Sequence, residues 1–498
     1  MKSINIMNFV RQIDERLPAE ADYLYKATAA ELALVRECGV ENTFLLQYDA
    51  LCDERFVTLF KENMTEHIEL GLWYEIVEPL TSACGMPYRS ERGWKWDWHI
   101  IPGFSMAYAP AERERLIDEA MRKFREVFGY YPKTVGSWLI DTHTMNHLDQ
   151  NYEISAMAIC RDQTNTDAYT LIGGYFNGAY YPSKNNIFTP AQSEEMRIGF
   201  PVFRLLGPCP LYNYDGKKYC TSTAANAPCT LEVVWETGSD PKNVDWFFRT
   251  FYENESLAFA YSQIGQENSF GKHDLVTPLR MQIEKAKKLT EVRMEKMCDT
   301  GEAFKRAFPH KTPAAAVTAL DSWDGNDVQS VCYDCENYMA NLFRFEKRIF
   351  LRALYLFDER VREHYLTETC TTFDAVYENL PIVDTLLWNK DEKRELGLMI
   401  DTDGVPFTVE KRNESELAVL WGEKSIVFRE DRILVSPGTL HFYTGEHAPE
   451  ILAEPNALRY RYRENEYALL LENAAVTECA DGFEILCGQN CALIPTRI

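Results

Sequence analysis

The first 275 residues alternate short apolar runs with amphipathic stretches of helical periodicity. This alternation is typical of a parallel sheet, because parallel strands cannot be joined by a tight turn and need a crossover helix between them. Seven strands with helices between them fit a closed (β/α)7-type barrel as well as a doubly wound open sheet. The predicted strands cover residues 43–49, 70–77, 98–102, 134–141, 154–162, 201–206 and 257–266.

The pattern changes after about residue 276. Two long amphipathic stretches without intervening strands, 277–297 and 342–362, predict a helical region. After residue 395, short apolar runs alternate with turns, which predicts a β-sandwich. The predicted domains of this α/β chain are a barrel at 1–275, a helical region at 276–390 and a β-sandwich at 391–498.

Acidic residues outnumber basic ones, 76 to 52, which gives the 498-residue chain a formal net charge of −24. Such a surface repels phosphate backbones and anionic lipid headgroups, so we expect neither nucleic acid nor a membrane surface as a partner. A neutral small molecule or neutral polymer fits better. No apolar run approaches the roughly 20 residues of a membrane span, and residues 1–10 lack the apolar core of a signal peptide, so we predict a cytoplasmic protein.

The 14 cysteines are scattered along the chain, which favours reduced, mostly buried thiols over a disulfide framework. The same interpretation applies to two closely spaced pairs, Cys332 with Cys335 and Cys487 with Cys491. The sequence has no G-x-G-x-x-G after a strand, no Walker A motif and no H-E-x-x-H. Nucleotide and zincin chemistry therefore lose their usual support, and we predict a protein without a cofactor.

Almost every predicted strand ends in a carboxylate, an imidazole or an amide. The carboxyl ends of parallel strands meet at one edge of a sheet or barrel, and active sites are built there. Any one of these residues could be an ordinary helix cap, but that explanation weakens when most of the strands share the feature. The polar residues are Asp49, Glu75, Glu78, His99, Asp141, Asp162, Gln163, Gln263 and Glu267.

Paired carboxylates at such an edge indicate glycosyl transfer to water, in which one carboxylic acid protonates the leaving oxygen and a second carboxylate acts as nucleophile or base. Asp141 and Glu267 could face each other across a barrel, with Glu75 and Asp162 as alternates. The segment 162–192 is rich in Tyr, Gly, Asn and Thr. Such a segment suits the apolar face and hydroxyl rim of a sugar, or it is a loop packed by its own tyrosines.

His143-Thr-Met-Asn-His147 would place both imidazoles on one face of a helix, a spacing that can bind a divalent metal. The alternative is a pair of surface or loop histidines.

Eight segments of the sequence, spread over most of the chain, carry a resemblance to known proteins. They are Val135–Asp141, Cys160–Gln163, Thr166–Leu171, Gly173–Tyr175, Tyr180–Ser183, Pro190–Gln192, Pro201–Arg204 and Gly265–Phe270. In these segments the chain resembles a bacterial family whose domain has no assigned function. That family in turn resembles, more weakly, the glycoside hydrolase/deacetylase superfamily, whose α-mannosidase-like and α-amylase-like branches have a (β/α)7 barrel followed by helical and β-sandwich regions.

In those branches the nucleophile ends the fourth strand and the acid/base lies on a later strand, so the resemblance implies Asp141 as nucleophile and Glu267 as acid/base. The α-mannosidase-like branch has His-x-Asp zinc ligands on its first strand, whereas this chain has Gln47-Tyr-Asp49. Asp49 and His99 could still hold a metal. With only two plausible ligands at those positions, we favour a metal-free site.

We therefore predict a glycoside hydrolase that acts on a small glycan or glycoside with retention, through Asp141 and Glu267. A metal-dependent sugar deacetylase using Asp49 and His99, and a non-catalytic carbohydrate-binding protein, stay open as alternatives. A homo-oligomer also stays open, because the long helices could pack on the barrel or against a second copy. The residues expected to bind the sugar are Asp49, Glu75, His99, Trp138, Arg161, Asp162, Gln163 and Gln263.

Overall fold

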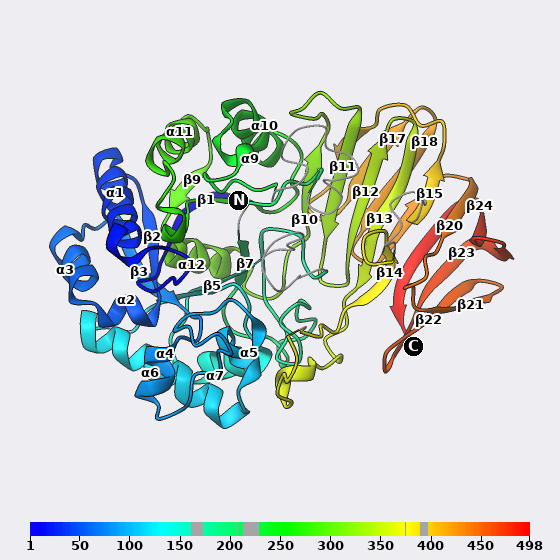
Figure 1. Cartoon of the computed structure of the whole chain (residues 1–498). Coiled ribbons are helices and arrows are strands. Elements are labelled where there is room, and N and C mark those ends of the chain that lie inside the picture. Colours follow the sequence, from blue (N-terminus) through cyan, green and yellow to red (C-terminus); the bar gives the residue numbers. More distant parts are fainter. Residues whose placement is uncertain (161–172, 206, 213–228, 374, 389–396) are drawn as a thin grey trace.

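The computed structural model describes residues 1–160, 173–205, 207–212, 229–373, 375–388 and 397–498. Two sheets dominate these ranges (Figure 1): a mainly parallel sheet surrounded by helices, and a large antiparallel sheet built from the later part of the chain. The predicted fold class, an α/β barrel followed by helices and a β-sandwich, is confirmed. Every helix in the ranges above is too short or too polar to cross a lipid bilayer.

The parallel sheet forms the barrel. Its strands follow the order β7-β5-β4-β3-β2-β1-β8, and the short β6 (Ala179–Tyr180) pairs antiparallel with β7. Across the seam, the ring of Phe203 on β7 lies 4.8 Å from the ring of Tyr261 on β8, so aromatic side chains fill the gap between the two end strands. The parallel strands are β1 (Lys2–Val10), β2 (Asn42–Leu46), β3 (Ile68–Trp73), β4 (Thr134–Ser137), β5 (Ala156–Cys160), β7 (Val202–Leu205) and β8 (Ala260–Ile264).

Helices cover the outside of the barrel (Figure 1). The longest, α6, begins at Pro110, where a missing N–H costs nothing, and ends before Gly129, whose φ of 86° terminates the helix. Its buried face packs on the barrel with Leu116, Ile117, Ala120, Met121 and Phe124. The helices are α1 (Tyr23–Cys38), α2 (Tyr48–Cys52), α3 (Glu54–Asn63), α4 (Glu78–Ala83), α5 (Ile100–Gly103), α6 (Pro110–Phe128), α7 (Thr142–Asn151), α9 (Glu236–Ser239), α10 (Pro241–Tyr252), α11 (Val276–Ala286) and α12 (Met297–Ala307).

The first turn of α12 closes the amino end of the barrel. The N–H groups of Met297 and Cys298 donate to Thr43 Oγ1 at 2.9 Å and to Glu69 Oε2 at 3.1 Å. The hydroxyls of Thr43 and Thr134, from the strands on either side, donate to the same carboxylate at 2.8 and 2.6 Å. Because an acidic side chain at a helix N-terminus is stabilising, Glu69 fixes α12 against this end of the barrel.

Gly265, directly after β8, allows the chain to turn sharply into the carboxyl edge of the barrel. Its φ is +131°, and a Cβ added there would lie 1.9 Å from the backbone oxygen of Met7 on β1. We therefore expect Gly265→Ala to lower the free energy of unfolding by about 2 to 4 kcal/mol, through backbone strain and a backbone clash together. Chemical denaturation measures this loss. Gly129→Ala is the matched control, because φ there is also positive but nothing lies within 4 Å of the added Cβ; an equal loss in both variants would contradict the clash.

The antiparallel sheet folds back on itself as two packed layers. Its main path runs β10-β11-β12-β13-β15-β20-β24-β19-β18-β17-β16. The ring of Tyr333 on β11 lies 5.4 Å from the ring of Phe428 on β18, so the two halves of the path share one core. The strands are β10 (Ala315–Ala319), β11 (Val328–Asp334), β12 (Tyr338–Phe345), β13 (Arg348–Leu356), β14 (Leu380–Asp384), β15 (Gly397–Asp401), β16 (Thr408–Lys411), β17 (Leu417–Trp421), β18 (Lys424–Arg429), β19 (Arg432–Val435), β20 (Gly438–Tyr443), β21 (Glu450–Glu454), β22 (Ala457–Tyr462), β23 (Asn465–Cys479) and β24 (Gly482–Arg497).

The helix predicted at 342–362 is wrong, because this segment contains the end of β12 and all of β13. Both faces of these strands are buried, so their apolar residues do not alternate with polar ones, and the resulting spacing resembles that of a helix. The helix predicted at 277–297 is also too long: α11 ends at Ala286, and the short β9 (Arg293–Glu295) pairs with β1 before α12 begins.

Two errors concern the barrel strands. The strand predicted at 98–102 is wrong, because this segment forms the short helix α5, with His99 as its N-cap. The prediction also missed β1, which is buried along almost its whole length and includes the polar residues Ser3, Asn5 and Asn8 among its buried positions. Two of these polar side chains are needed inside the structure, since Asn5 and Ser3 bond to the β9–α12 segment.

Candidate active site

A buried arginine pairs with one carboxylate and lies near a second at the carboxyl edge of the barrel. Arg11 directly follows β1, Glu75 lies two residues after β3, and Glu267 lies three residues after β8. Arg11 Nη2 lies 2.8 Å from Glu267 Oε2, and the Ser269 hydroxyl donates to Glu267 Oε1 at 2.5 Å. The exposed fractions of Arg11, Glu75 and Glu267 are only 2%, 3% and 6%. The ion pair is almost fully shielded from water, and the bonds from Arg11 and Ser269 fix the orientation of the Glu267 carboxylate.

Trp96 brings Glu75 to the same arginine. Its indole N–H donates to Glu75 Oε2 at 2.6 Å, and its ring lies under the Arg11 guanidinium at 4.2 Å from the centroid. Burial raises the pKa of the Glu75 carboxyl; the Arg11 charge and the Trp96 bond oppose this shift, and the nearby Glu267 charge adds to it. We call Arg11, Glu75, Trp96 and Glu267 the Arg11 cluster. It holds one carboxylate in an ion pair and a second carboxyl whose pKa burial raises.

An aromatic floor lies at the carboxyl ends of β1, β3 and β4. Phe9 and Trp73 stack with ring centroids 4.3 Å apart, and Trp138 meets them edge-on at 5.4 and 5.1 Å. Phe9 is also bridged through its backbone to Glu267, which places this floor beside the Arg11 cluster. Trp138, predicted as a sugar-binding residue, belongs to this floor and is 7% exposed.

A tryptophan strip, Trp94, Trp96 and Trp98, extends from the Arg11 cluster to the surface. Arg92 lies over the rings of Trp94 and Trp98, at 4.5 and 4.2 Å, and Arg16 lies over Trp96 and Trp98 at 4.7 and 5.2 Å. This strip is not among the residues predicted from the sequence. Three tryptophans at alternate positions in one short segment are the signal that could have revealed it.

Asp49 fixes the segment after β1 rather than pointing to an open site. Its Oδ2 accepts the N–H groups of Gln12 and Ile13 at 2.8 and 2.6 Å, and burial raises its pKa to about 6 although these bonds lower it. Next to this clamp is a cavity of about 580 Å³ on the carboxyl side of the barrel. Its lining includes Gln12, Ile13, Asp14, Tyr23, Tyr25, Arg55, Phe56 and Lys95.

The other predicted sugar-binding residues are more scattered. His99 is about a quarter exposed, bonds to Asp97 Oδ1 at 2.6 Å and stacks on Trp98, so it lies beside the tryptophan strip. Gln263 lies in the middle of β8, inside the barrel, where its amide donates to the Tyr261 hydroxyl at 2.8 Å. Arg161, Asp162 and Gln163 lie outside the described residues.

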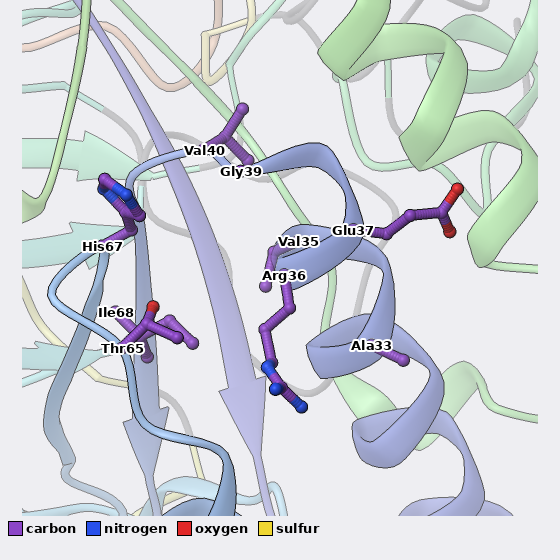
Figure 2. Close-up of a pocket in the computed structure, with 9 residues that line it drawn as sticks. All are labelled: Ala33, Val35, Arg36, Glu37, Gly39, Val40, Thr65, His67 and Ile68. Atoms are coloured by element: carbon purple, nitrogen blue, oxygen red, sulfur yellow. The ribbon is translucent and has the colours of Figure 1, made fainter.

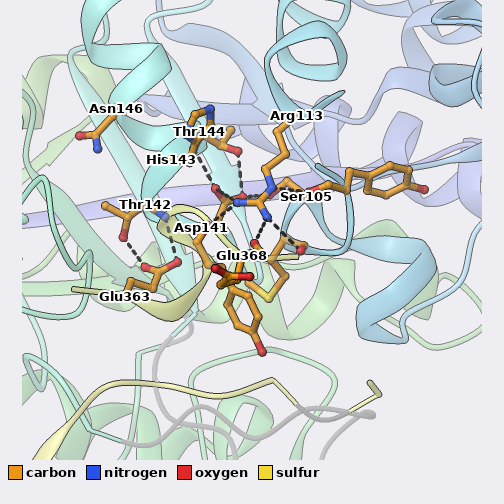
Figure 3. Close-up of polar contacts among 12 residues, drawn as sticks. Ser105, Arg113, Asp141, Thr142, His143, Thr144, Asn146, Glu363 and Glu368 are labelled. Atoms are coloured by element: carbon orange, nitrogen blue, oxygen red, sulfur yellow. Dashed lines mark hydrogen bonds and ion pairs between the residues drawn. The ribbon is translucent and has the colours of Figure 1, made fainter. Parts of the chain in front are cut away.

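Asp141 contacts a different set of residues (Figure 3). It is the N-cap of α7, is fully buried, and accepts bonds from the Thr144 N–H and hydroxyl at 2.9 and 2.8 Å. Arg113, also fully buried, donates to it at 3.0 Å, and Ser105 donates at 2.5 Å. Four donors occupy its two oxygens, an environment suited to a capping carboxylate. Its role as the nucleophile stays a prediction.

Glu363 lies on the other side of the α7 N-terminus and accepts bonds from the N–H and the hydroxyl of Thr142 (Figure 3). Burial raises its pKa to about 8, and the charge of Asp141 contributes. A carboxyl with a raised pKa in the folded state binds its proton there up to pH 8, whereas the unfolded chain releases it near pH 4.5. Stability from this group is therefore present at low pH and is lost as the pH rises toward 8.

Glu363→Gln removes this titration. We expect the free energy of unfolding of the native chain to fall between pH 5 and pH 8 more steeply than that of the variant, by on the order of 2 to 4 kcal/mol. Denaturant titrations of both proteins across this range measure the difference. Parallel pH profiles would contradict it.

A second cavity, of about 420 Å³, lies between the end of α1 and the beginnings of β2 and β3 (Figure 2). It is therefore at the amino side of the barrel, whereas the active sites of such barrels lie at the carboxyl side. His67 lines it and pairs with Glu41 at 2.8 Å.

His143 and His147 pair with Glu114 and Asp118 of α6 at 2.9 and 2.8 Å. In the described part of the chain, no three His, Cys, Asp or Glu side chains are arranged to hold a metal ion.

Comparisons with known proteins agree with the fold. A scan of family models and a search of curated proteins find no match. A solved structure from Parabacteroides distasonis, named as a candidate glycoside hydrolase/deacetylase, matches with a TM-score of 0.58 at 13% identity, over 79% of this chain and 93% of that chain. This chain shares its fold. The likeness confirms the resemblance predicted from the sequence.

Two further solved structures match over a smaller part of the chain. A probable polysaccharide deacetylase from Pseudomonas aeruginosa has a TM-score of 0.39 at 12% identity, over 62% of this chain and 92% of that one. A polysaccharide deacetylase from Mycobacterium smegmatis, also named as a candidate, has a TM-score of 0.36 at 12% identity, over 61% and 90%.

Proposed function

We propose that this chain hydrolyses glycosidic bonds in a small glycan or glycoside, with the Arg11 cluster as its catalytic centre. The observation that supports this most is the pair Glu75 and Glu267, two buried carboxyls from different strands held in contrasting environments around one arginine. Two carboxyl groups with different surroundings can take the separate roles of acid and nucleophile. The fold shared with a protein named as a candidate glycoside hydrolase/deacetylase supports a carbohydrate substrate.

The two environments assign the acid/base and the nucleophile. Glu75, whose pKa burial raises, protonates the glycosidic oxygen as the bond to the anomeric carbon breaks. Glu267, oriented by Arg11 and Ser269, attacks the anomeric carbon as a carboxylate. Water, deprotonated by Glu75, then hydrolyses the glycosyl–Glu267 ester, which gives retention. This differs from the sequence-based assignment, in which Asp141 attacks and Glu267 is the acid/base.

The aromatic side chains supply the binding surface. A sugar has an apolar face and a rim of hydroxyls, and it is bound by packing on aromatic rings together with many hydrogen bonds. The tryptophan strip begins beside Glu75 and includes the partly exposed rings of Trp94 and Trp98, over which the Arg16 and Arg92 guanidinium groups lie.

The proposal is tested by incubating the purified chain with a panel of glycans, glycosides and acetylated glycans, with and without a chelator, and analysing products by mass spectrometry. We expect a saccharide released by addition of water, at the same rate with chelator. Loss of acetyl groups that the chelator abolishes would instead support a metal-dependent deacetylase. A ligand that binds without being converted would support a carbohydrate-binding protein.

A further inference from the structure

Two cysteines in β24 lie unusually close together. The sulfurs of Cys487 and Cys491 are 3.0 Å apart and share a hydrogen bond, and both residues are buried, with exposed fractions of 4% and 0%. In a regular strand, residues four positions apart would be separated by about 13 Å. The backbone must therefore leave the strand between them and return.

The strand does so at a bulge. Up to Cys487 the chain pairs with β20, where Cys487 lies opposite Gly438, and from Cys491 it pairs with β19, where Cys491 lies opposite Val435. The three residues between them, 488–490, are exposed, and Asn490 has a φ of +56°. The opposing strand shifts its register at the same point, between Glu472 and Ala474. The bulge thus brings the two sulfurs together at the point where β24 changes partners.

We propose that Cys487 and Cys491 are a redox-active pair that a small peroxide oxidises to a disulfide across this bulge. The Cys491 thiol loses its proton and attacks hydrogen peroxide as the thiolate. The O–O bond breaks, a sulfenic acid forms, and the leaving hydroxide takes up that proton to become water. The Cys487 sulfur then displaces the sulfenic hydroxyl as a second water. The two sulfurs lose two electrons and two protons in all, and one peroxide becomes two waters. The sulfurs need to approach by roughly 1 Å to reach disulfide bonding distance.

The contact between the thiols supports Cys491 as the attacking group. The close contact between the two thiols lowers the pKa of the Cys491 thiol and raises that of Cys487. Thiolates are the reactive form of cysteine, so the group with the lowered pKa reacts first.

Cys332 and Cys335 are a matched control, since they are also buried and close in sequence. Cys332 accepts a bond from the Asn341 amide, and the Cys335 thiol donates to the Tyr338 backbone oxygen. Burial raises the pKa of the Cys335 thiol. These thiols are oriented to other groups, and we expect them to resist the same peroxide treatment.

The test is a peptide map of the full chain after treatment with a slight excess of hydrogen peroxide, alkylation under denaturing conditions and digestion with trypsin. Residues 464–497 form one peptide, because no Lys or Arg lies between Arg463 and Arg497, and it contains Cys479, Cys487 and Cys491. We expect this peptide to carry one alkyl group, on Cys479, and to weigh about 2 Da less than its dithiol form. Dithiothreitol before alkylation restores three alkyl groups. The oxidised chain should also unfold about 2 to 4 °C higher.

Three alkyl groups on this peptide after peroxide treatment would overturn the proposal. A disulfide to Cys479 would also overturn it, as would an oxidised Cys491 sulfur beside an alkylated Cys487. Oxidation of Cys332 and Cys335 to the same extent would show that the bulge confers no selectivity, and would also overturn it. In Cys487→Ser, the Cys491 sulfenic acid should persist and be captured by dimedone. If that variant does not fold, the map of the native chain decides alone.

Discussion

Glu267→Gln is expected to lower kcat/KM by at least about 10³-fold, because the amide cannot attack the anomeric carbon and Arg11 loses its ionic partner. Glu75→Gln removes the proton donor and should cost about 10² to 10⁴-fold on a substrate with a poor leaving group. On an aryl glycoside whose leaving group needs no proton, Glu75→Gln should lose far less in the bond-breaking step, whereas Glu267→Gln should be impaired on both substrates.

Glu91→Gln is the matched control for these variants. It removes an exposed carboxylate from the same segment as Trp96, and activity should stay within about twofold of the native chain. Circular dichroism and a denaturation midpoint establish that each variant is folded. Full activity of folded Glu267→Gln on both substrates would contradict the proposed role of Glu267.

Arg113→Met is expected to destabilise the chain by about 3 to 5 kcal/mol. The substitution leaves Asp141 buried without its cation, and it removes the donor that binds the backbone oxygens of Tyr108, Met106, Tyr365 and Glu368. Breaking one side of a fully buried ion pair costs this much because the remaining charge cannot reach water. The bonds to Tyr365 and Glu368 also mean that the variant loosens residues 365–368 from the barrel. Chemical denaturation measures the loss.

Arg122→Met, on the same helix, provides the comparison. Arg122 pairs with Glu119 and Glu126 at the surface and is more than half exposed, so its removal should cost less than about 1 kcal/mol. Similar losses for the two variants would contradict the structural role assigned to the Arg113–Asp141 pair. Asp141→Asn extends the test, because the kcat/KM of its folded protein distinguishes a helix cap from a nucleophile. A loss of about 10³-fold in kcat/KM would favour the nucleophile.

The sequence predicted the barrel because its parallel strands are short apolar runs that end in polar residues, and this signal is local. The prediction failed in β13, where both faces are buried and apolar residues do not alternate with polar ones. It also failed in β1, where the polar side chains of Asn5 and Ser3 form hydrogen bonds inside the structure. Residues 342–362 have the apolar spacing of a helix, but they form strands because β12 pairs with β13 and β13 pairs with β15. Their local sequence does not reveal this pairing.

The site was predictable in part for the same reason. Strand ends identified Glu75 and Glu267, but a strand end does not say whether a carboxyl caps a helix, clamps a loop or faces a substrate. Asp141 and Asp49 turn out to cap and clamp, because their partners are backbone and side-chain donors brought by other segments. Arg11, the centre of the cluster, follows β1, a strand that was not predicted from the sequence. Trp96 donates to Glu75 because the segment before α5 folds back against the end of β3, and this contact could not be predicted from the sequence.

The most direct test of the account is to label the nucleophile. Once a substrate is found, a mechanism-based reagent of the same sugar configuration, such as a 2-deoxy-2-fluoro glycoside with a good leaving group, should form a stable ester with the attacking carboxylate. Digestion and mass spectrometry then locate the sugar. We predict the label on Glu267, in the peptide that includes residues 265–270, and none in Glu267→Gln. A label on Asp141 would contradict the catalytic centre proposed around Arg11.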